Sequence, residues 1–315
     1  MSFRTRLCDV LEIEVPVLQG GMAWVATGEL AAAVSDAGGL GIIGAGNAPA
    51  DVLEKEIKKV KRLTNKPFGV NIMLLSPFVD EVVDLLCQEE VPVVTTGAGN
   101  PGKYIDRFKE KGMKIIPVVS AVALAKRLER LEVDAMIAEG LEAGGHIGQL
   151  TTMVLVPQIV DAVRVPVIAA GGIADGRGVA AALALGAQGV QMGTRFICAH
   201  ECTVHPSYKE KVIKAKDRDT VVTGESTGHP VRVLNNKLAR EFAKLEKAGA
   251  TPEELERFGA GKLAAAVRDG DVVNGSIMAG QSAAMVVKEQ SCQEIMNDLK
   301  TGTLRVIQEL QQIFG

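Results

Sequence analysis

Between residues 15 and 195 the sequence alternates short aliphatic runs with longer segments in which apolar residues recur at helical spacing. Most of the runs end in glycine or a small polar residue, which is typical of parallel strands joined by crossover helices. The runs cover residues 15–22, 40–44, 68–72, 91–97, 114–120, 135–140, 166–172 and 189–195. Eight strand–helix units predict an α/β fold, a closed (β/α)8 barrel, with an open doubly wound sheet as the weaker alternative.

This even alternation stops after residue 195. Residues 199–272 show helical spacing with more charge, and Pro252 stands where the first turn of a helix accepts proline. We therefore expect a barrel over residues 1–198 and an appended helical subdomain over the barrel mouth at residues 199–272. A return loop and closing helices that pack on the barrel are expected at residues 273–315.

The composition supports buried parallel strands and excludes several classes of protein. Hydrophobic residues make up 47% of the chain and aromatic residues only 3%, as in aliphatic parallel sheets. The net charge of −3 and the absence of a polybasic segment argue against nucleic acid as a partner. Charges interrupt the first twelve residues, and no apolar run is long enough for a bilayer, so we expect neither signal peptide nor membrane span. Five scattered cysteines indicate reduced thiols in a cytoplasm.

Two other motifs have plainer explanations. Matches to Gly-x-Gly-x-x-Gly occur at 39–44 and 97–102, but the first lies within a strand. The second lacks an acidic residue at the end of the next strand, so we favour chain turns over a dinucleotide site. The cysteines and histidines of 198–205 match no standard zinc spacing, so we place them at the barrel rim and assign no metal.

Glycine turns follow the seventh and eighth expected strands, at Gly171-Gly172 and Gly193-Thr194. In (β/α)8 barrels this corner binds phosphate through backbone N–H groups and the start of a short helix. The glycines allow the chain to approach a phosphate closely, and Thr194 adds a hydroxyl. The pattern favours a phosphate-bearing cofactor over glycines that only turn the chain.

His146 follows Gly144-Gly145 at the catalytic end of the sixth expected strand, where a core histidine is unusual. We interpret it as a functional residue. Asn71 is a polar residue inside an apolar run. Its side chain could hydrogen-bond the edge of a cofactor ring or could satisfy backbone groups at the barrel top.

At these residues the sequence resembles a known family, the nitronate monooxygenases and FMN-dependent enoyl-[acyl-carrier-protein] reductases. Within it, the flavin-type enoyl reductases of bacterial fatty-acid synthesis are the most similar. The resemblance is carried by residues 142–153 (EAGGHIGQLTTM), 168–173 (IAAGGI) and 191–196 (QMGTRF), and it extends through 16–22, 70–72, 95–101 and 274–281. Several motifs in one order are more specific than any motif alone.

The resemblance implies a TIM barrel that holds one noncovalent FMN. It places Gly21, Met22 and Asn71 along the isoalloxazine, Glu139 near the ribityl chain or ring, and Gly144 and Gly145 in contact with the flavin. It places Gly171, Gly172, Gly193 and Thr194 at the phosphate, and Ser120 as a weaker cofactor contact. The phosphate position agrees with the corner inferred from the glycine turns.

The implied activity reduces FMN with NADH or NADPH and then passes hydride to a trans-2-enoyl thioester on acyl carrier protein, in fatty-acid elongation. His146 is the implied catalytic residue, orienting the substrate or donating a proton. The resemblance also implies a homodimer and a response to ammonium or potassium, at a site that residue spacing does not locate.

There are three alternatives to this reductase. A nitronate monooxygenase would use the same histidine as a base, and its flavin would react with oxygen. Residues 147–153 and 274–281 favour the reductase. An FMN-binding protein without turnover stays open. An IMP-dehydrogenase-like barrel would need a nucleophilic cysteine in the loop that carries His146, and none is there.

Overall fold

The computed structural model describes residues 3–314, so Met1, Ser2 and Gly315 lie outside the described residues. Eight parallel strands form one sheet in the order β1-β9-β8-β6-β5-β4-β3-β2. A bridge between Leu18 and Leu40 joins its two outer strands and closes the barrel. The strands are β1 (Val17–Gln19), β2 (Gly41–Gly46), β3 (Phe68–Met73), β4 (Val93–Gly97), β5 (Lys114–Val119), β6 (Met136–Glu139), β8 (Val167–Ala170) and β9 (Gly189–Met192). The predicted (β/α)8 barrel is confirmed.

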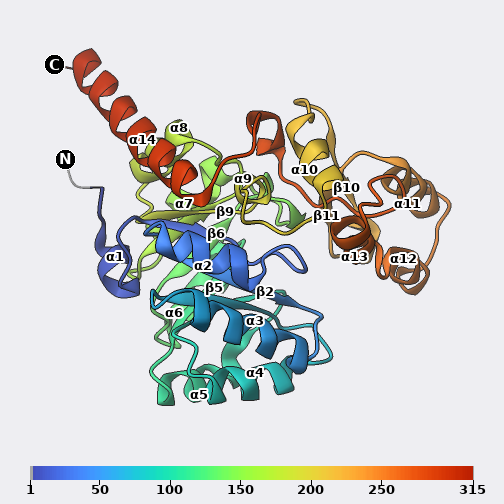
Figure 1. Ribbon diagram of the computed structural model, residues 1–315, viewed down its shortest axis with the longest axis horizontal. Helices are drawn as coiled ribbons and strands as arrows, with labels where there is room; N and C mark the ends of the chain where they lie inside the picture. The colour runs from blue at the N-terminus through green and yellow to red at the C-terminus, as the bar shows by residue number, and fades with distance from the viewer. Residues whose placement is uncertain (1–2, 315) are drawn as a thin grey trace.

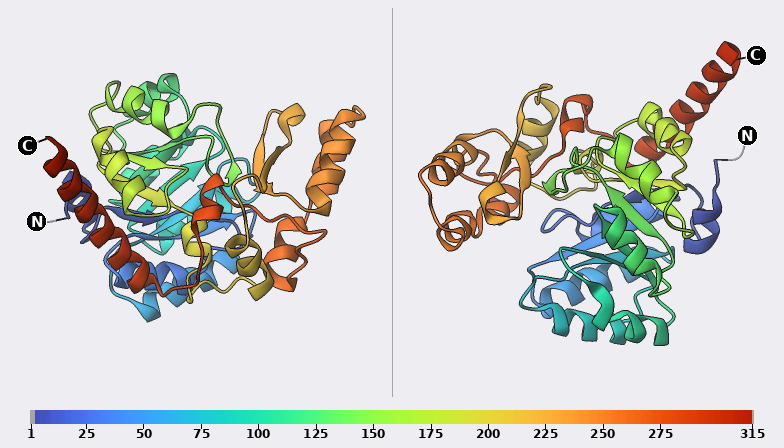
Figure 2. Two further views of the ribbon diagram at one scale, coloured as in Figure 1. Left: turned by 90° about the horizontal axis from the view of Figure 1, so that it is seen from above. Right: turned by 180° about the vertical axis from the view of Figure 1, so that it is seen from behind.

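Helices follow the strands and surround the barrel (Figures 1 and 2). They are α2 (Gly28–Asp36), α3 (Ala50–Leu63), α4 (Val79–Gln88), η1 (Pro101–Lys103), α5 (Ile105–Glu110), α6 (Val122–Glu129), α7 (Thr152–Val160), α8 (Gly176–Ala184) and α9 (Thr194–Ile197). In α3, the buried Leu53, Ile57 and Val60 recur every three or four residues and form one apolar stripe. Burying each such side chain contributes about 1.5–3 kcal/mol, so packing on the strands stabilises a helix that is otherwise polar.

The barrel interior is filled with aliphatic side chains and has a plug at its amino end. Leu18, Ile42 and Ile168 pack there together with Leu7 and Leu11 of the short helix α1 (Arg6–Leu11). The plug leaves the carboxyl ends of the strands as the open end, which we call the barrel mouth. Active sites of (β/α)8 barrels lie at that end.

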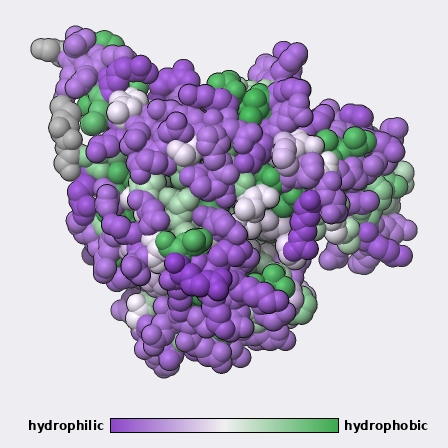
Figure 3. Space-filling model, in the orientation of Figure 1, coloured by the Kyte–Doolittle hydropathy of each residue, from purple (hydrophilic) through white to green (hydrophobic). Residues whose placement is uncertain are grey.

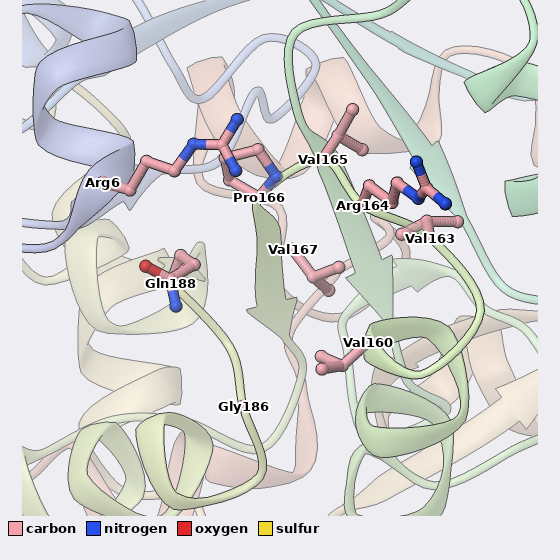
Figure 4. Close-up of a pocket in the computed structure, with 9 residues that line it drawn as sticks. All are labelled: Arg6, Val160, Val163, Arg164, Val165, Pro166, Val167, Gly186 and Gln188. Atoms are coloured by element: carbon pink, nitrogen blue, oxygen red, sulfur yellow. The ribbon is translucent and has the colours of Figure 1, made fainter.

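A cavity of about 210 Å³ lies at the amino end, beside the plug. Arg6 and Gln188 border one side of it, Arg164 borders the other, and valine side chains line its wall (Figure 4). Its lining residues come from α1 and from the loops that lead into β8 and β9. None of the expected site residues lines this cavity.

The segment after the barrel contains strands as well as helices, which the sequence pattern did not predict. Its helices are α10 (Pro206–Ile213), η2 (Glu225–Thr227), α11 (Lys237–Lys247), α12 (Pro252–Gly259), α13 (Lys262–Ala264) and the π-helical η3 (Ala265–Asp269). β10 (Thr220–Thr223) and β11 (Val231–Leu234) form a hairpin that pairs with β7 (Gly145–His146). The helical pattern at 199–272 did not indicate this hairpin, because short strands of four residues give weak alternation in a sequence.

The chain then returns to the barrel through η4 (Gln281–Met285) and the long helix α14 (Cys292–Phe314). α14 packs on α8, and its C-terminal half projects beyond the barrel (Figure 1). The two helices approach closely because Gly176 and Gly302 have no side chain; a β-carbon at Gly176 would overlap the backbone of Gly302 and Thr303. Residues 206–270 lie at the opposite side of the molecule from α1 and the C-terminal half of α14 (Figure 2).

The surface seen in Figure 3 is mostly hydrophilic, with hydrophobic residues in small separate patches. Among the described residues, no helix combines the length and hydropathy required to cross a bilayer.

Candidate functional site

The expected site residues lie at the barrel mouth, at the carboxyl ends of their strands. Gly21 and Met22 follow β1, Asn71 lies in β3, Ser120 follows β5, and Glu139 ends β6. Gly171 and Gly172 follow β8, whereas Gly193 and Thr194 connect β9 to α9. Gly144, Gly145 and His146 lie in the segment after β6. Parallel strands bring these positions to one edge although they are up to 173 residues apart in the sequence (21 to 194).

The loop after β1 packs against neighbouring strands. A β-carbon at Gly21 would overlap the side chain of Asn71, and one at Gly193 would lie 3.1 Å from the Met22 sulfur. The Thr95 hydroxyl donates to the Asn71 Oδ1 over 2.8 Å. This bond fixes the Asn71 amide, so that its NH2 group stays available for another acceptor.

The turns after β8 and β9, which we call the phosphate corner (Gly171, Gly172, Gly193 and Thr194), leave backbone donors free. Within the described residues, neither the Gly172 N–H nor the Gly193 N–H donates a hydrogen bond. Thr194 is the first residue of α9, so its N–H also has no acceptor inside the helix. Three free N–H groups around glycine turns fit a phosphate, which accepts several such bonds.

The backbone at Gly171 and Gly172 requires glycine. Their φ angles are +96° and +74°, a region in which other residues are strained. Thr152 holds the turn in place, because its hydroxyl lies 3.0 Å from the Gly171 carbonyl oxygen. The Thr152 N–H in turn donates to the Glu142 carboxylate at 2.9 Å, and this carboxylate links the corner to the segment before His146.

The return loop before η4 covers the corner from the other side. Gly280 N–H donates to the Thr194 Oγ1 over 2.9 Å, and Gln281 N–H donates to the Glu142 carbonyl oxygen over 2.9 Å. A β-carbon at Gly144 would come within 2.6 Å of Ala279 backbone atoms. The glycines at 144 and 280 therefore serve close packing between this loop and the segment that carries His146.

His146 lies in the segment 141–150, which we call the histidine loop. The loop is closed at its base by a bond from Leu141 N–H to the Leu150 carbonyl oxygen, 2.8 Å long. Its centre, β7, pairs with β11, and His146 stands opposite Val231. The sequence analysis treated this segment as a free loop, because a two-residue strand has no pattern of its own.

The environment of the His146 ring favours its neutral form. His146 is exposed to solvent on one side, while the protein on the other side disfavours the charged ring and lowers its pKa, and the nearby His229 adds to the effect. Within the described residues, the ring makes no hydrogen bond to another protein group. An imidazole with a lowered pKa is mostly neutral at pH 7 and offers one N–H donor and one nitrogen acceptor.

Glu139 is the second titratable group of the mouth. It retains partial solvent contact, but the protein around the carboxyl desolvates it and raises its pKa to about 7. No basic residue offsets this effect. Near neutral pH the carboxyl therefore exists in both forms and can donate a hydrogen bond as well as accept one.

Two further sets of residues from the sequence analysis have the following places in the structure. Ser120 follows β5 and packs against Gly148, at the far end of the histidine loop. The side chains of 198–205 serve separate roles: Cys198 donates to the Lys209 carbonyl, and the His205 ring accepts from Ser207 N–H. In residues 3–314 no group of three or more His, Cys, Asp or Glu side chains is arranged to hold a metal ion.

The sequence analysis missed several residues that build the mouth. They are Thr95, Glu142, Thr152 and Gly280, which hold the site residues described above, and Arg232 of β11. Thr95, Glu142, Thr152 and Gly280 all stand inside the stretches that carry the family resemblance, which was the available signal. Nothing in the sequence indicates that Arg232 reaches the histidine loop, since 91 residues separate it from Leu141.

These features fit the FMN that the resemblance implies. The free N–H groups of the phosphate corner match a phosphate, and within residues 3–314 the Asn71 NH2 group and the Glu139 carboxyl make no hydrogen bond to the protein. The residues that would hold the cofactor are those of the phosphate corner at one end and those after β1 and in β3 at the other.

Comparisons with known proteins agree with the fold and the motifs. A family profile for nitronate monooxygenases matches residues 4–82 and 76–302. A probable nitronate monooxygenase of Staphylococcus saprophyticus is 38% identical over 289 residues, which cover 77% of this chain and 81% of that protein. In Mycobacterium tuberculosis, a (3aS,4S,5R,7aS)-5-hydroxy-7a-methyl-1-oxo-octahydro-1H-indene-4-carboxyl-CoA dehydrogenase is 41% identical over 82% of this chain and 74% of its own length.

Two solved structures extend the comparison over the whole chain. FabK from Thermotoga maritima is 52% identical, with a TM-score of 0.96, over 98% of this chain and 99% of its own. A nitroalkane oxidase from Streptomyces ansochromogenes is 29% identical, with a TM-score of 0.87, over 97% and 100% of the two chains. The relatives are oxidoreductases, and so is this protein. The barrel, the glycine turns and these matches together show that the chain belongs to the nitronate monooxygenase family.

Proposed function

We propose that this protein reduces trans-2-enoyl thioesters on acyl carrier protein, using NADH or NADPH and a bound FMN. The observation that carries this proposal is the 52% identity to FabK, an enoyl-acyl carrier protein reductase, over almost the full length of both chains. The site residues expected for such an enzyme lie together at the barrel mouth. The elongation step of bacterial fatty-acid synthesis would be its place of action.

When bound, FMN would supply the hydride transfer from the nicotinamide to the β-carbon of the enoyl group, which no side chain can perform. The phosphate corner would hold the phosphate through the N–H groups of Gly172, Gly193 and Thr194. Asn71, fixed by Thr95, would donate its amide to the flavin ring edge. Glu139 would hydrogen-bond the ribityl chain or ring as donor or acceptor, because its pKa lies at about 7.

His146 would act on the substrate. Because its pKa is lowered, the neutral ring would donate its N–H to the thioester carbonyl oxygen and orient the enoyl group. A smaller protonated fraction would remain to supply a proton to the α-carbon. The lowered pKa favours the orienting role at neutral pH.

A nitronate monooxygenase is the second candidate, favoured by the family profile and the staphylococcal relatives. In that reaction the neutral His146 would accept a proton from the nitroalkane carbon, and a lowered pKa suits a base at neutral pH. The two functions use the same residues, so the reductant and the substrate must distinguish them.

The test mixes the purified protein anaerobically with NADH and then with crotonyl thioester. The reductase predicts rapid bleaching of the flavin and return of colour with the enoyl substrate, with ammonium and potassium compared as additives. Oxygen-dependent turnover of a propyl nitronate without NADH, and no bleaching, would reject the reductase in favour of the monooxygenase. Bound flavin with neither reaction would support a binding protein without turnover. A colourless protein that refuses added FMN would reject all three.

Acyl carrier protein and a second copy of this chain would be the partners of the reductase. The homodimer is tested by light scattering of the purified protein, and carrier dependence by comparing enoyl groups on carrier protein with the same groups on coenzyme A.

A further inference from the structure

Arg232 comes from the segment beyond the barrel but lies beside the histidine loop. In the pairing of β11 with β7, Arg232 stands opposite Gly145 and Val231 stands opposite His146. Directly opposed residues of an antiparallel pair point to the same face, so Arg232 and His146 occupy opposite faces. Gly145 has no side chain, and its φ of +77° requires glycine.

The Arg232 side chain holds the base of the histidine loop. Its Nε donates to the Leu141 carbonyl oxygen over 3.0 Å, and its Nη1 donates to the Thr220 hydroxyl over 3.3 Å. Leu141 is the residue whose N–H closes the loop onto Leu150. One side chain thus connects β10, β11 and the loop base, while its own backbone supports the strand that contains His146.

The charge of Arg232 has an unusual environment. Arg232 is only 5% exposed, and no acidic side chain of the described residues forms an ion pair with it. The nearest carboxylate, that of Glu142, accepts hydrogen bonds from Thr152 instead. A buried cation without an ion pair is costly, and an apolar side chain of similar volume is often neutral or more stabilising. A gain in stability therefore does not explain why an arginine stands at this position. The rigid guanidinium explains it, because its N–H donors have a fixed geometry.

The position of His146 depends on this support, because its ring makes no hydrogen bond that could orient it within the described residues. Its place at the mouth follows from the backbone of β7 and from the loop base. A displacement of about 1 Å at a reacting group can reduce a rate by roughly 100-fold.

We propose that Arg232 is a positioning residue that sets the geometry of the histidine loop, and through it of His146, from the subdomain side. This inference rests on the proposed function for its kinetic consequence, but not for its structural one. The guanidinium makes no hydrogen bond to the residues of the phosphate corner, so its loss should reach the corner only indirectly, through Leu141 and the neighbouring Glu142.

The experiment compares Arg232→Met and Arg232→Lys with the wild type, and uses Arg240→Met as a matched control. Arg240 is exposed on α11, and its guanidinium donates a hydrogen bond to the Asn235 Oδ1. In stopped flow, Arg232→Met should reoxidise its flavin with crotonyl thioester about 10–100-fold more slowly than the wild type. The rate at which NADH reduces its flavin should change less than twofold. Arg232→Lys should recover part of the lost reoxidation rate. The melting temperature of Arg232→Met should not fall.

Hydrogen exchange gives a readout that does not depend on activity. The amides of 141–150 should exchange faster in Arg232→Met and remain as in the wild type in Arg240→Met. Unchanged exchange together with unchanged reoxidation would overturn the proposal. An equal loss in both half-reactions, with a lower melting temperature, would assign Arg232 a merely structural role and also overturn it. If the wild type does not react with enoyl thioesters, the proposed function fails, and exchange alone decides the role of Arg232.

Discussion

The phosphate corner and the histidine loop lie at the same barrel mouth but are built in different ways. The corner consists of backbone groups at the ends of two adjacent strands, β8 and β9, and needs little beyond glycine turns. The histidine loop is held by residues far along the chain, among them Arg232 and Gln281, which bond to Leu141 and Glu142. The barrel itself therefore provides most of the proposed cofactor end, to which the return loop adds one bond from Gly280 to Thr194, whereas the later segments fix the position of His146.

This difference predicts that the two regions fail separately. Changes in the corner should remove the cofactor and every reaction that uses it. Changes in the His146 side chain or in its supports should leave the cofactor bound and affect mainly the substrate step, whereas Gly144 and Gly145 of the same loop are expected to contact the flavin. The following changes, from the largest expected effect to the smallest, test this separation.

Gly193→Val should abolish flavin binding. A branched side chain at 193 would crowd Met22 and occupy the space between the free N–H groups and the phosphate. The absorbance of the purified protein measures the bound flavin, and circular dichroism checks the fold. Gly259→Ala, at the end of α12, is the control, since its β-carbon would meet no atom closer than 3.8 Å. A fully yellow Gly193→Val protein would show that the phosphate lies elsewhere.

His146→Ala should leave flavin binding unchanged and slow the reaction with enoyl thioester by about 100-fold or more, the usual contribution of a positioned acid or base. Flavin reduction by NADH should stay within twofold of the wild type. Stopped-flow measurement of each half-reaction gives the comparison. His200→Ala, an exposed histidine outside the mouth, serves as control. Wild-type turnover in His146→Ala would remove this residue from the mechanism.

Thr194→Val should weaken FMN binding by about tenfold, since one hydrogen bond to a charged group contributes about 1.5–3 kcal/mol. The change also removes the acceptor for Gly280 N–H. Titration of apoprotein with FMN measures the dissociation constant. Thr194→Ser should restore it, because the hydroxyl returns. If Thr194→Ser binds as weakly as Thr194→Val, the return of the hydroxyl does not restore binding, which contradicts a hydrogen bond from this hydroxyl to the phosphate.

Glu139→Gln should change how the stability of the apoprotein depends on pH. The pKa of Glu139 is raised to about 7 in the folded chain and is near 4.5 when unfolded. The stabilising contribution of its protonated form is therefore complete below pH 4.5 and is lost as the pH rises through 7. Between pH 5 and pH 8 the free energy of unfolding of the wild type should fall by roughly 2–3 kcal/mol more than that of Glu139→Gln.

Denaturant melts at these two pH values measure the difference. Glu110→Gln, which replaces an exposed carboxylate on α5, should retain the wild-type dependence on pH. Equal pH dependence in Glu139→Gln and the wild type would mean that solvent reaches the carboxyl freely.

Much of the barrel could be predicted from the sequence because each unit has its own local signal. The aliphatic run at 166–172 predicted β8, and the helical spacing between the runs at 40–44 and 68–72 predicted α3. The glycines after β8 and β9 also located the corner, since positive φ angles and close approach require glycine at fixed points. Such features depend on neighbours in sequence.

The strands β7, β10 and β11 were missed because they are too short to show alternation. β7 has only two residues and exists because β11 offers it backbone partners. The supports of the site, Thr95 for Asn71 and Arg232 for Leu141, were missed for a related reason. A hydrogen bond across 24 or 91 residues leaves no periodic trace in one sequence.

The sequence by itself determined the barrel and the glycine turns at its mouth, and it predicted a functional His146 beside them, because strand patterns and glycine turns are local. Only the tertiary structure decided that His146 lies in a strand supported from beyond the barrel and that Glu139 has a raised pKa. Both outcomes follow from packing, which sets what surrounds a side chain, whereas the sequence sets only what that side chain is.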